Sequence, residues 1–428
     1  MPQSSHHSEQ QCKDSRTVLN SNEPNVEVWP VRLEREPGLI MHFFDHVFPI
    51  QHPGYRQLME DGGRGWYLSL MLSQKTLYHA VLCLSAYHRE MTMKQRGKTS
   101  HQLTLQDLRT HNALSFTVLQ QQLRRDAKLT NLNERIGMIA GITQMMFFQL
   151  LFFDDEQWKT HLEILTMMIN DVYIDVLQLV NSTDLPPTEC EELQAFIFFG
   201  GFLIWADLQS RISIGKGPRL SKLHDQMLKE LPVPFQLQYF IGCESWVLQI
   251  ISKIASIREW KTKQGILGKI EDLEIHRKSE QIKDSLTNGL SRIENTLQNM
   301  PTLSDQRSSV ETTRIFALSA TILLYITISG PRPDTMEVRT SVCRTIHSLK
   351  QLKDMNQLRV LPWALYVTGC MATGEDRQYI LDLFNSLHTL FSGACSRDKY
   401  SQMLRRYWAA METNSEFMLK LVEEYANS

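Results

Sequence analysis

The sequence predicts an all-α protein, an irregular array of about a dozen or more packed helices with no significant sheet. From about residue 38 onwards, apolar residues recur at spacings of three and four, which is the period of an amphipathic helix. Proline and glycine interrupt these runs where helices begin or end. Strand signals are scarce, since the pair Asn288 and Gly289 lies inside a helical pattern rather than between alternating apolar runs. The chain also lacks the fixed-period repeat of a helical solenoid.

The predicted helices follow one another along the chain. Three early segments, 39–50, 77–91 and 103–126, each carry apolar residues at helical spacing. In the third, one face is formed by Leu105, Leu108, Ala113, Phe116, Leu119 and Leu123. Breaks that stop or start a helix lie at Pro49 to Gly54, Pro186 to Pro187, Gly215 to Pro218, Pro232 to Pro234 and Gly330 to Pro333.

The chain is predicted to form one helical domain behind a polar tail. Residues 1–28 contain few apolar side chains, so we expect a disordered tail there. Residues 29–428 are expected to fold as a single α-helical domain. Within it, residues 262–283 are polar and charged, and we interpret them as a loose surface connection.

Composition places the chain among ordinary globular proteins. Hydrophobic residues make up 42% and charged residues 21% of the sequence, and the formal net charge of −2 argues against a protein that coats nucleic acid through overall basicity. Seven cysteines are scattered along the chain, unlike the framework of a secreted disulfide-rich protein. We therefore expect reduced thiols in an intracellular protein.

Two apolar segments, 139–153 and 315–329, test the idea of a membrane protein. Each would be roughly 22 Å long as a helix, which is shorter than a hydrocarbon core of about 30 Å. Gln144 and Gln149 interrupt the first segment, and Arg314 and Gly330 bound the second. We interpret both as buried core helices and expect no membrane contact.

His42 and His46 stand four residues apart, a spacing that can chelate zinc on a helix. The zinc-protease pattern also requires Glu directly after the first histidine, and this sequence has Phe43 there. A third ligand is not apparent from the sequence. We interpret the pair as ordinary helix histidines and predict no metal site.

The stretch Gly369 to Gly374 has the glycine spacing of a phosphate loop and contains Cys370 as a candidate nucleophile. Glu375 and Asp376 follow where a phosphate loop requires Lys and Ser or Thr, and carboxylates there would repel phosphate. Apolar neighbours would raise the pKa of the Cys370 thiol, whereas a nucleophile needs it lowered. The stretch is better explained as a helix that starts at Pro362 and ends before Gly374.

The sequence contains neither a G-x-S-x-G elbow nor a dinucleotide fingerprint. We therefore predict no catalytic residue, no cofactor and no enzyme. The segment 144–153, rich in aromatic residues and methionine, suits either core packing or the wall of a ligand cavity. The short basic pairs, such as Arg124-Arg125 and Arg405-Arg406, fit solvated helix faces. Residues 416–426 fit an amphipathic final helix or an acidic activation segment.

Several stretches taken together resemble the fungal-specific transcription factor domain family, in its second type. The opening helix LIMHFFDHVFPI is similar to the family's first motif, and LPWALYVTGCMATGEDRQYILDLFNSL is similar to its closing motif. Between them, and in the family's order, lie further similar segments: 76–90, 111–123, 158–169, 204–221 and 240–257, followed by Trp408. One departure is Glu163-Ile164, where the family has Gly-Ala.

The resemblance implies a helical regulatory domain in a nuclear transcription regulator. Such a regulator would act through protein partners of the transcription machinery, a DNA-binding regulator, or a small-molecule effector, and would control a metabolic gene set. The family's two-zinc cluster needs six closely spaced cysteines, but only Cys12 precedes residue 83 in this sequence. The resemblance therefore does not bring zinc or direct DNA binding with it. The alternative interpretation is an effector-binding or scaffold protein without a direct role in transcription.

Overall fold

The computed structural model describes residues 35–55, 63–97, 102–124, 131–152, 157–182, 190–213, 216–230, 241–266, 272–301, 306–352, 354–390 and 399–413. These residues form helices and short connections and contain no strand. The predicted all-α fold is therefore confirmed. The expected tail of residues 1–28 and the segment 416–426 lie outside the described residues.

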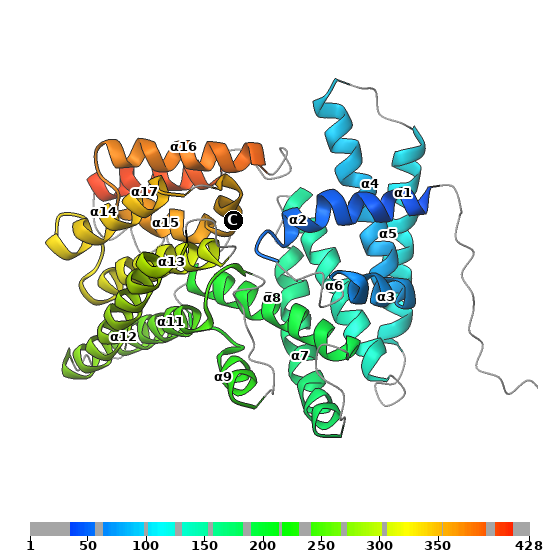
Figure 1. The fold of residues 1–428 in the computed structure, drawn as a ribbon, viewed down its shortest axis with the longest axis horizontal. Helices are drawn as coiled ribbons and strands as arrows, with labels where there is room; N and C mark the ends of the chain where they lie inside the picture. The colour runs from blue at the N-terminus through cyan, green and yellow to red at the C-terminus, as the bar shows by residue number, and fades with distance from the viewer. Residues whose placement is uncertain are drawn as a thin grey trace, which may run out of the picture.

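The first part of the chain forms one group of helices. They are α1 (Glu36–His42), a π-helical turn (Phe43–Val47), α2 (Phe48–Gln51), α3 (Gly65–Ser73), α4 (Lys75–Gln95), α5 (Gln102–Leu123), α6 (Leu132–Phe152), α7 (Gln157–Ser182), α8 (Glu191–Ser213) and α9 (Ser221–Glu230). In Figure 1, α1 to α7 occupy one side of the molecule, and α8 runs towards its centre.

The second group occupies the other side of Figure 1. It comprises α11 (Ser245–Ile266), α12 (Asp272–Asn299), α13 (Arg307–Ser329), α14 (Met336–Lys350), a 3₁₀ turn (Met355–Val360), α15 (Pro362–Met371), α16 (Glu375–Leu390) and α17 (Lys399–Thr413). The central helix α13 packs against α11, α12, α14 and α15. Burial on several sides explains why its sequence is apolar almost all round.

One hydrophobic core joins the two groups, with buried members from Phe43 to Ala410. Aromatic side chains carry the core from α8 into the second group. The Trp205 ring lies edge-on to Phe316 at 5.4 Å, and Phe316 stacks on Trp363 at 5.6 Å between ring centroids. One continuous core therefore contains residues from both groups of helices.

Within the described part of the chain, two helices, Glu191–Ile212 and Arg307–Ser329, are long and apolar enough to cross a membrane, but 61% and 67% of their apolar windows are buried inside the fold. Segment 315–329 lies within the second of these helices. In α6, Ile139, Ile142 and Met146 are also buried. Both segments that we expected to be core helices are therefore packed inside the protein.

The expected surface connection at 262–283 is wrong. Residues 262–266 end α11 and residues 272–283 begin the long helix α12. Ile275, Ser279 and Ile282 are buried at spacings of three and four, and α12 packs against α11 and α13. The many charged side chains belong to the exposed face of an amphipathic helix, which needs only a narrow apolar stripe.

Candidate functional site

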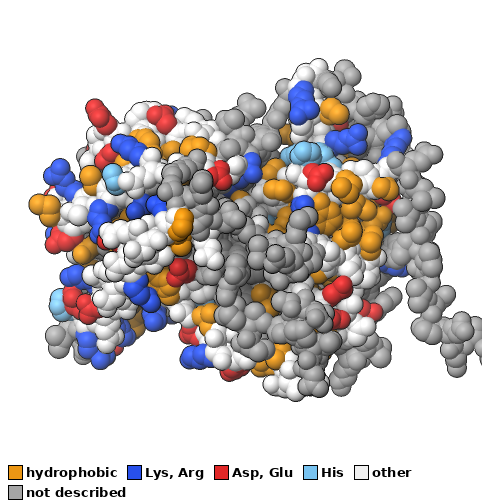
Figure 2. Space-filling view, in the orientation of Figure 1, with side chains coloured by type: hydrophobic (Ala, Val, Ile, Leu, Met, Phe, Trp, Pro, Cys, Tyr) orange, Lys and Arg blue, Asp and Glu red, His pale blue; other side chains and the backbone are white. Residues whose placement is uncertain are grey.

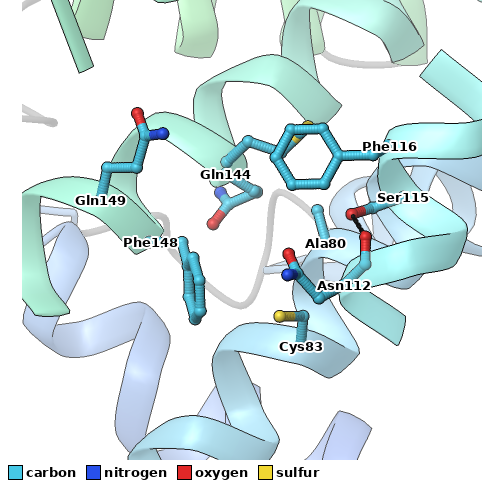
Figure 3. A pocket seen from close by; sticks show the side chains of 9 residues that line it. Ala80, Cys83, Asn112, Ser115, Phe116, Gln144, Phe148 and Gln149 are labelled. Carbon is cyan, nitrogen blue, oxygen red and sulfur yellow. Dashed lines mark hydrogen bonds between the residues drawn. The ribbon is translucent and has the colours of Figure 1, made fainter. Parts of the chain in front are cut away.

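A pocket of about 160 Å³ lies between α4, α5 and α6 (Figure 3). Each helix contributes lining residues three or four positions apart, which lie on the same face of that helix. The lining residues are Ala80 and Cys83 from α4, Asn112, Ser115 and Phe116 from α5, and Gln144, Met145, Phe148 and Gln149 from α6. Phe116 is 41% exposed, so its ring stands where the pocket meets solvent.

The lining of the pocket carries no charge. None of the nine side chains is basic or acidic, and burial raises the pKa of the Cys83 thiol to about 12. A thiol of that pKa stays protonated near neutral pH and is a poor nucleophile. The Ser115 hydroxyl donates to the Asn112 backbone carbonyl at 2.9 Å. The lining therefore suits the binding of uncharged groups rather than catalysis.

A buried chain of polar side chains holds one wall of the pocket in place. The Gln144 Oε1 atom accepts a hydrogen bond from Gln51 Nε2 at 2.8 Å, and Gln144 Nε2 donates to the Tyr67 hydroxyl at 2.8 Å. Both bonds are buried, which makes them costly to leave unmade. The pocket wall is thereby tied to α2 and α3.

The segment 144–153 contributes both to the core and to the pocket, since Met145 and Met146 are buried members of the hydrophobic core. Four residues of the segment, Gln144, Met145, Phe148 and Gln149, line the pocket. Sequence reasoning missed the residues of α4 and α5, because their approach to α6 depends on helix packing that no local pattern encodes. Of the face predicted for α5, Leu119 is buried, but Ala113 and Phe116 are exposed, so that prediction is only partly correct.

The predicted histidine pair meets a third histidine in the structure. His42 Nε2 lies 3.0 Å from Nδ1 of His88 on α4, and the rings of His42 and His46 are 4.7 Å apart. Burial, and then the neighbouring histidines, lower the pKa values of His42 and His88 to about 4. Among the described residues, no group of three or more His, Cys, Asp or Glu is arranged to hold a metal ion.

The stretch around Cys370 is the helix end that the sequence predicted. α15 starts at Pro362, α16 starts at Glu375, and Gly374 between them has a φ of 56°. Cys370 is buried, and this burial raises the pKa of its thiol to about 12. A thiol with a raised pKa does not suit a nucleophile.

A buried carboxylate fixes the connection from α8 to α9. Asp207 is fully buried in α8, and its Oδ2 atom accepts a hydrogen bond from the Leu220 backbone N–H at 2.9 Å. Arg211 Nε donates to the Gly217 carbonyl at 3.0 Å, and the Gly217 N–H donates to Glu259 at 2.8 Å. These hydrogen bonds therefore fix the positions of Gly217 and Leu220 relative to α8.

Exposed apolar side chains gather on the first group of helices. Figure 2 shows hydrophobic side chains close together over the part of the surface formed by α1 and α3. Met41 of α1 and Leu72 of α3 are more than half exposed, and Leu68 of α3 is also exposed. Exposed apolar patches are typical of surfaces that contact another molecule.

The fold is a helical domain with a small, uncharged pocket between α4, α5 and α6. A comparison with protein families gives its identity: a model described as the fungal-specific transcription factor domain matches residues 38–422. The chain belongs to this family. Its members are transcription factors rather than enzymes, so this protein is a member of a transcription regulator family.

Named relatives are regulators of fungal biosynthesis. The pestheic acid cluster transcriptional regulator 3 of Pestalotiopsis fici is 28% identical over 413 residues, covering 89% of this chain and 72% of that protein. The trichothecene biosynthesis transcription regulator TRI10 of Fusarium sporotrichioides is 24% identical over 405 residues, covering 89% of this chain and 93% of that protein. Its namesake in Trichoderma arundinaceum is 26% identical, covering 89% and 90%. No solved structure matches the chain at a significant level.

Proposed function

We propose that this protein acts in the nucleus as a regulator of a biosynthetic gene set. It does so through its helical domain, by binding a protein partner or a small-molecule effector. The observation that carries the proposal is the match of a transcription factor domain to residues 38–422. Relatives named as regulators of biosynthetic clusters support the kind of gene set.

Contact with DNA is supplied by a partner in this proposal. A two-zinc cluster needs six closely spaced thiolates, which the sequence does not contain. The five described cysteines do not fit such a cluster, because each lies on or beside a different helix: Cys83, Cys190, Cys243, Cys343 and Cys370. The exposed apolar residues Met41, Leu68 and Leu72 offer a surface for a protein partner.

The test combines gene deletion with a reporter. Deletion is expected to change transcript levels of a biosynthetic gene set, and a tagged copy is expected to enter the nucleus. Fusion of the chain to a heterologous DNA-binding domain is expected to change expression of a reporter that carries the matching DNA site. Unchanged transcripts together with exclusion from the nucleus would overturn the proposal in favour of a scaffold or effector-binding role outside transcription.

Direct DNA binding is tested separately with the purified chain. We expect only weak binding to duplex DNA, without sequence preference, at physiological salt. Tight binding with a steep salt dependence would show that the chain contacts several phosphates by itself. That result would contradict the role assigned to a DNA-binding partner.

A further inference from the structure

We propose that the pocket between α4, α5 and α6 binds a small, uncharged aromatic molecule that carries a single hydrogen-bonding group. This inference rests on the proposed function in one respect, namely that the domain responds to a small-molecule effector. The pocket chemistry stands on its own geometry, which involves side chains from three helices (Figure 3).

The volume of the pocket suits a ligand with a single aromatic ring. Its volume is about 160 Å³, and an apolar cavity of about 150 Å³ is known to accept benzene. Phe116 and Phe148 stand on different sides of the space in Figure 3, and Ala80 leaves room between them. Aromatic rings favour stacked or edge-on contact with another ring. A six-membered aromatic ring with one small substituent fits this space.

The charge of the lining excludes ionised ligands. None of the lining side chains is charged, and burial keeps the Cys83 thiol protonated. A carboxylate or ammonium group would lose its hydration here without gaining a counter-charge. The side-chain amide of Asn112 points into the space in Figure 3, and an amide both donates and accepts hydrogen bonds. A phenolic hydroxyl or a single carbonyl group satisfies this amide.

The pocket is preformed. Gln144 borders the space but cannot swing into it without breaking its buried hydrogen bonds to Gln51 and Tyr67. A wall held in one position spares the ligand the cost of ordering it. The exposed ring of Phe116 marks the side on which a ligand enters from solvent.

The test uses the purified full chain with p-cresol as the neutral probe and benzoate as its charged counterpart. We expect saturable binding of p-cresol in ligand-observed NMR, with a Kd of about 0.1–1 mM for a molecule of this size. Benzoate is expected to show no saturable binding at the same concentrations. Absence of saturable p-cresol binding, or equal binding of benzoate, would overturn the inference.

Matched variants locate the binding. Ala80→Leu fills the pocket and is expected to weaken p-cresol binding at least about tenfold. Ala113→Leu places the same change on the exposed face of α5 and is expected to bind as the wild type does. Phe116→Ala removes a solvent-exposed wall, so it tests the site even if Ala80→Leu does not fold. Phe116→Ala is expected to weaken p-cresol binding. Unchanged binding by Phe116→Ala, or by a folded Ala80→Leu, would place the probe elsewhere and refute the assignment.

The two proposals fail in different ways. If p-cresol does not bind but gene deletion changes transcripts, the pocket inference is wrong and the regulatory function stands. If p-cresol binds and is lost in Ala80→Leu, but deletion leaves transcripts unchanged, the pocket stands and the regulatory function is wrong.

Discussion

Replacing Gly369 by leucine tests the close packing of the last helices. A Cβ atom at Gly369 would lie 2.9 Å from Leu404 Cδ1 and 3.0 Å from Ile380 Cγ2. The Gly369 carbonyl also accepts a buried hydrogen bond from Trp408 Nε1 at 2.9 Å. Gly369 on α15 therefore lies within direct reach of side chains from α16 and α17, with no space for a side chain of its own.

The loss of folding free energy expected for Gly369→Leu is the sum of two terms. Extra carbons forced into a packed core cost about 1–3 kcal/mol. If α15 moves away from α17, the buried Trp408 N–H loses its acceptor, which costs about 1–3 kcal/mol more. The sum of about 2–6 kcal/mol is a large part of the 5–15 kcal/mol typical of a folded protein. With an unfolding entropy of about 2.1 cal/mol/K per residue, a domain spanning residues 38–422 should melt about 2–7 °C lower.

Thermal melts and a reporter assay measure the effect, with Cys370→Ala as the neighbouring control. Cys370 is buried but small, so its loss should cost about 1 kcal/mol and leave regulation intact. Gly369→Leu should lower the melting temperature and reduce the change in reporter expression that the wild-type chain produces. A Gly369→Leu variant that melts within a degree of wild type would refute the packing argument. A folded Cys370→Ala variant that no longer regulates would give the thiol a function that the structure does not assign to it.

Three further predictions concern other parts of the core. Gly289→Ala should destabilise by about 1–2 kcal/mol despite the better helix propensity of alanine, because its Cβ would lie 2.2 Å from the Trp246 ring. Burial raises the pKa of Asp207, so the neutral variant Asp207→Asn should be at least as stable as wild type in urea at neutral pH. Asp207→Leu should lower the free energy of unfolding by about 1–3 kcal/mol, because the buried Leu220 N–H loses its acceptor. Burial lowers the pKa of His52 to about 3, so the unfolded state binds more protons below about pH 6.5. Stability should therefore fall as the pH drops from 6.5, and between pH 7.5 and 5.5 wild type should lose about 1 kcal/mol more than His52→Leu in urea titrations.

Control variants and contrary outcomes distinguish these specific effects from nonspecific destabilisation of the fold. Gly200→Ala places a Cβ at an ordinary 3.4 Å from Met227 inside α8, so it should be neutral or stabilising in the same melts. A stabilised Gly289→Ala would show that Trp246 moves aside at little cost. Equal losses for Asp207→Asn and Asp207→Leu would contradict the capping role of the Asp207 side chain. Parallel pH profiles for wild type and His52→Leu would show that His52 does not titrate as its burial requires.

The sequence predicted the structure correctly where the cause lies within a few neighbouring residues. Proline at the first turn of α15 and glycine at Gly374 act within a few residues, so the helix end around Cys370 was predictable. Apolar spacing likewise predicted core helices such as α13, because burial on all sides requires apolar residues all round. The same reasoning failed at 262–283, since the three buried positions of α12 within that segment, Ile275, Ser279 and Ile282, are too few to stand out among its charges.

The sequence by itself determined the helical fold, the absence of known catalytic motifs and the membership of a transcription factor family. These follow from periodicity, from helix-terminating residues and from ordered motifs, all of which are properties of neighbouring positions along the chain. Only the tertiary structure decided which faces of the helices pack against one another. It brought His88 to His42 over 46 residues, tied Gln144 to Gln51 over 93 residues, and opened a pocket between α4, α5 and α6. The physical reason is that helix packing depends on the shapes of two surfaces at once, so a pocket is a property of their fit and not of either segment alone.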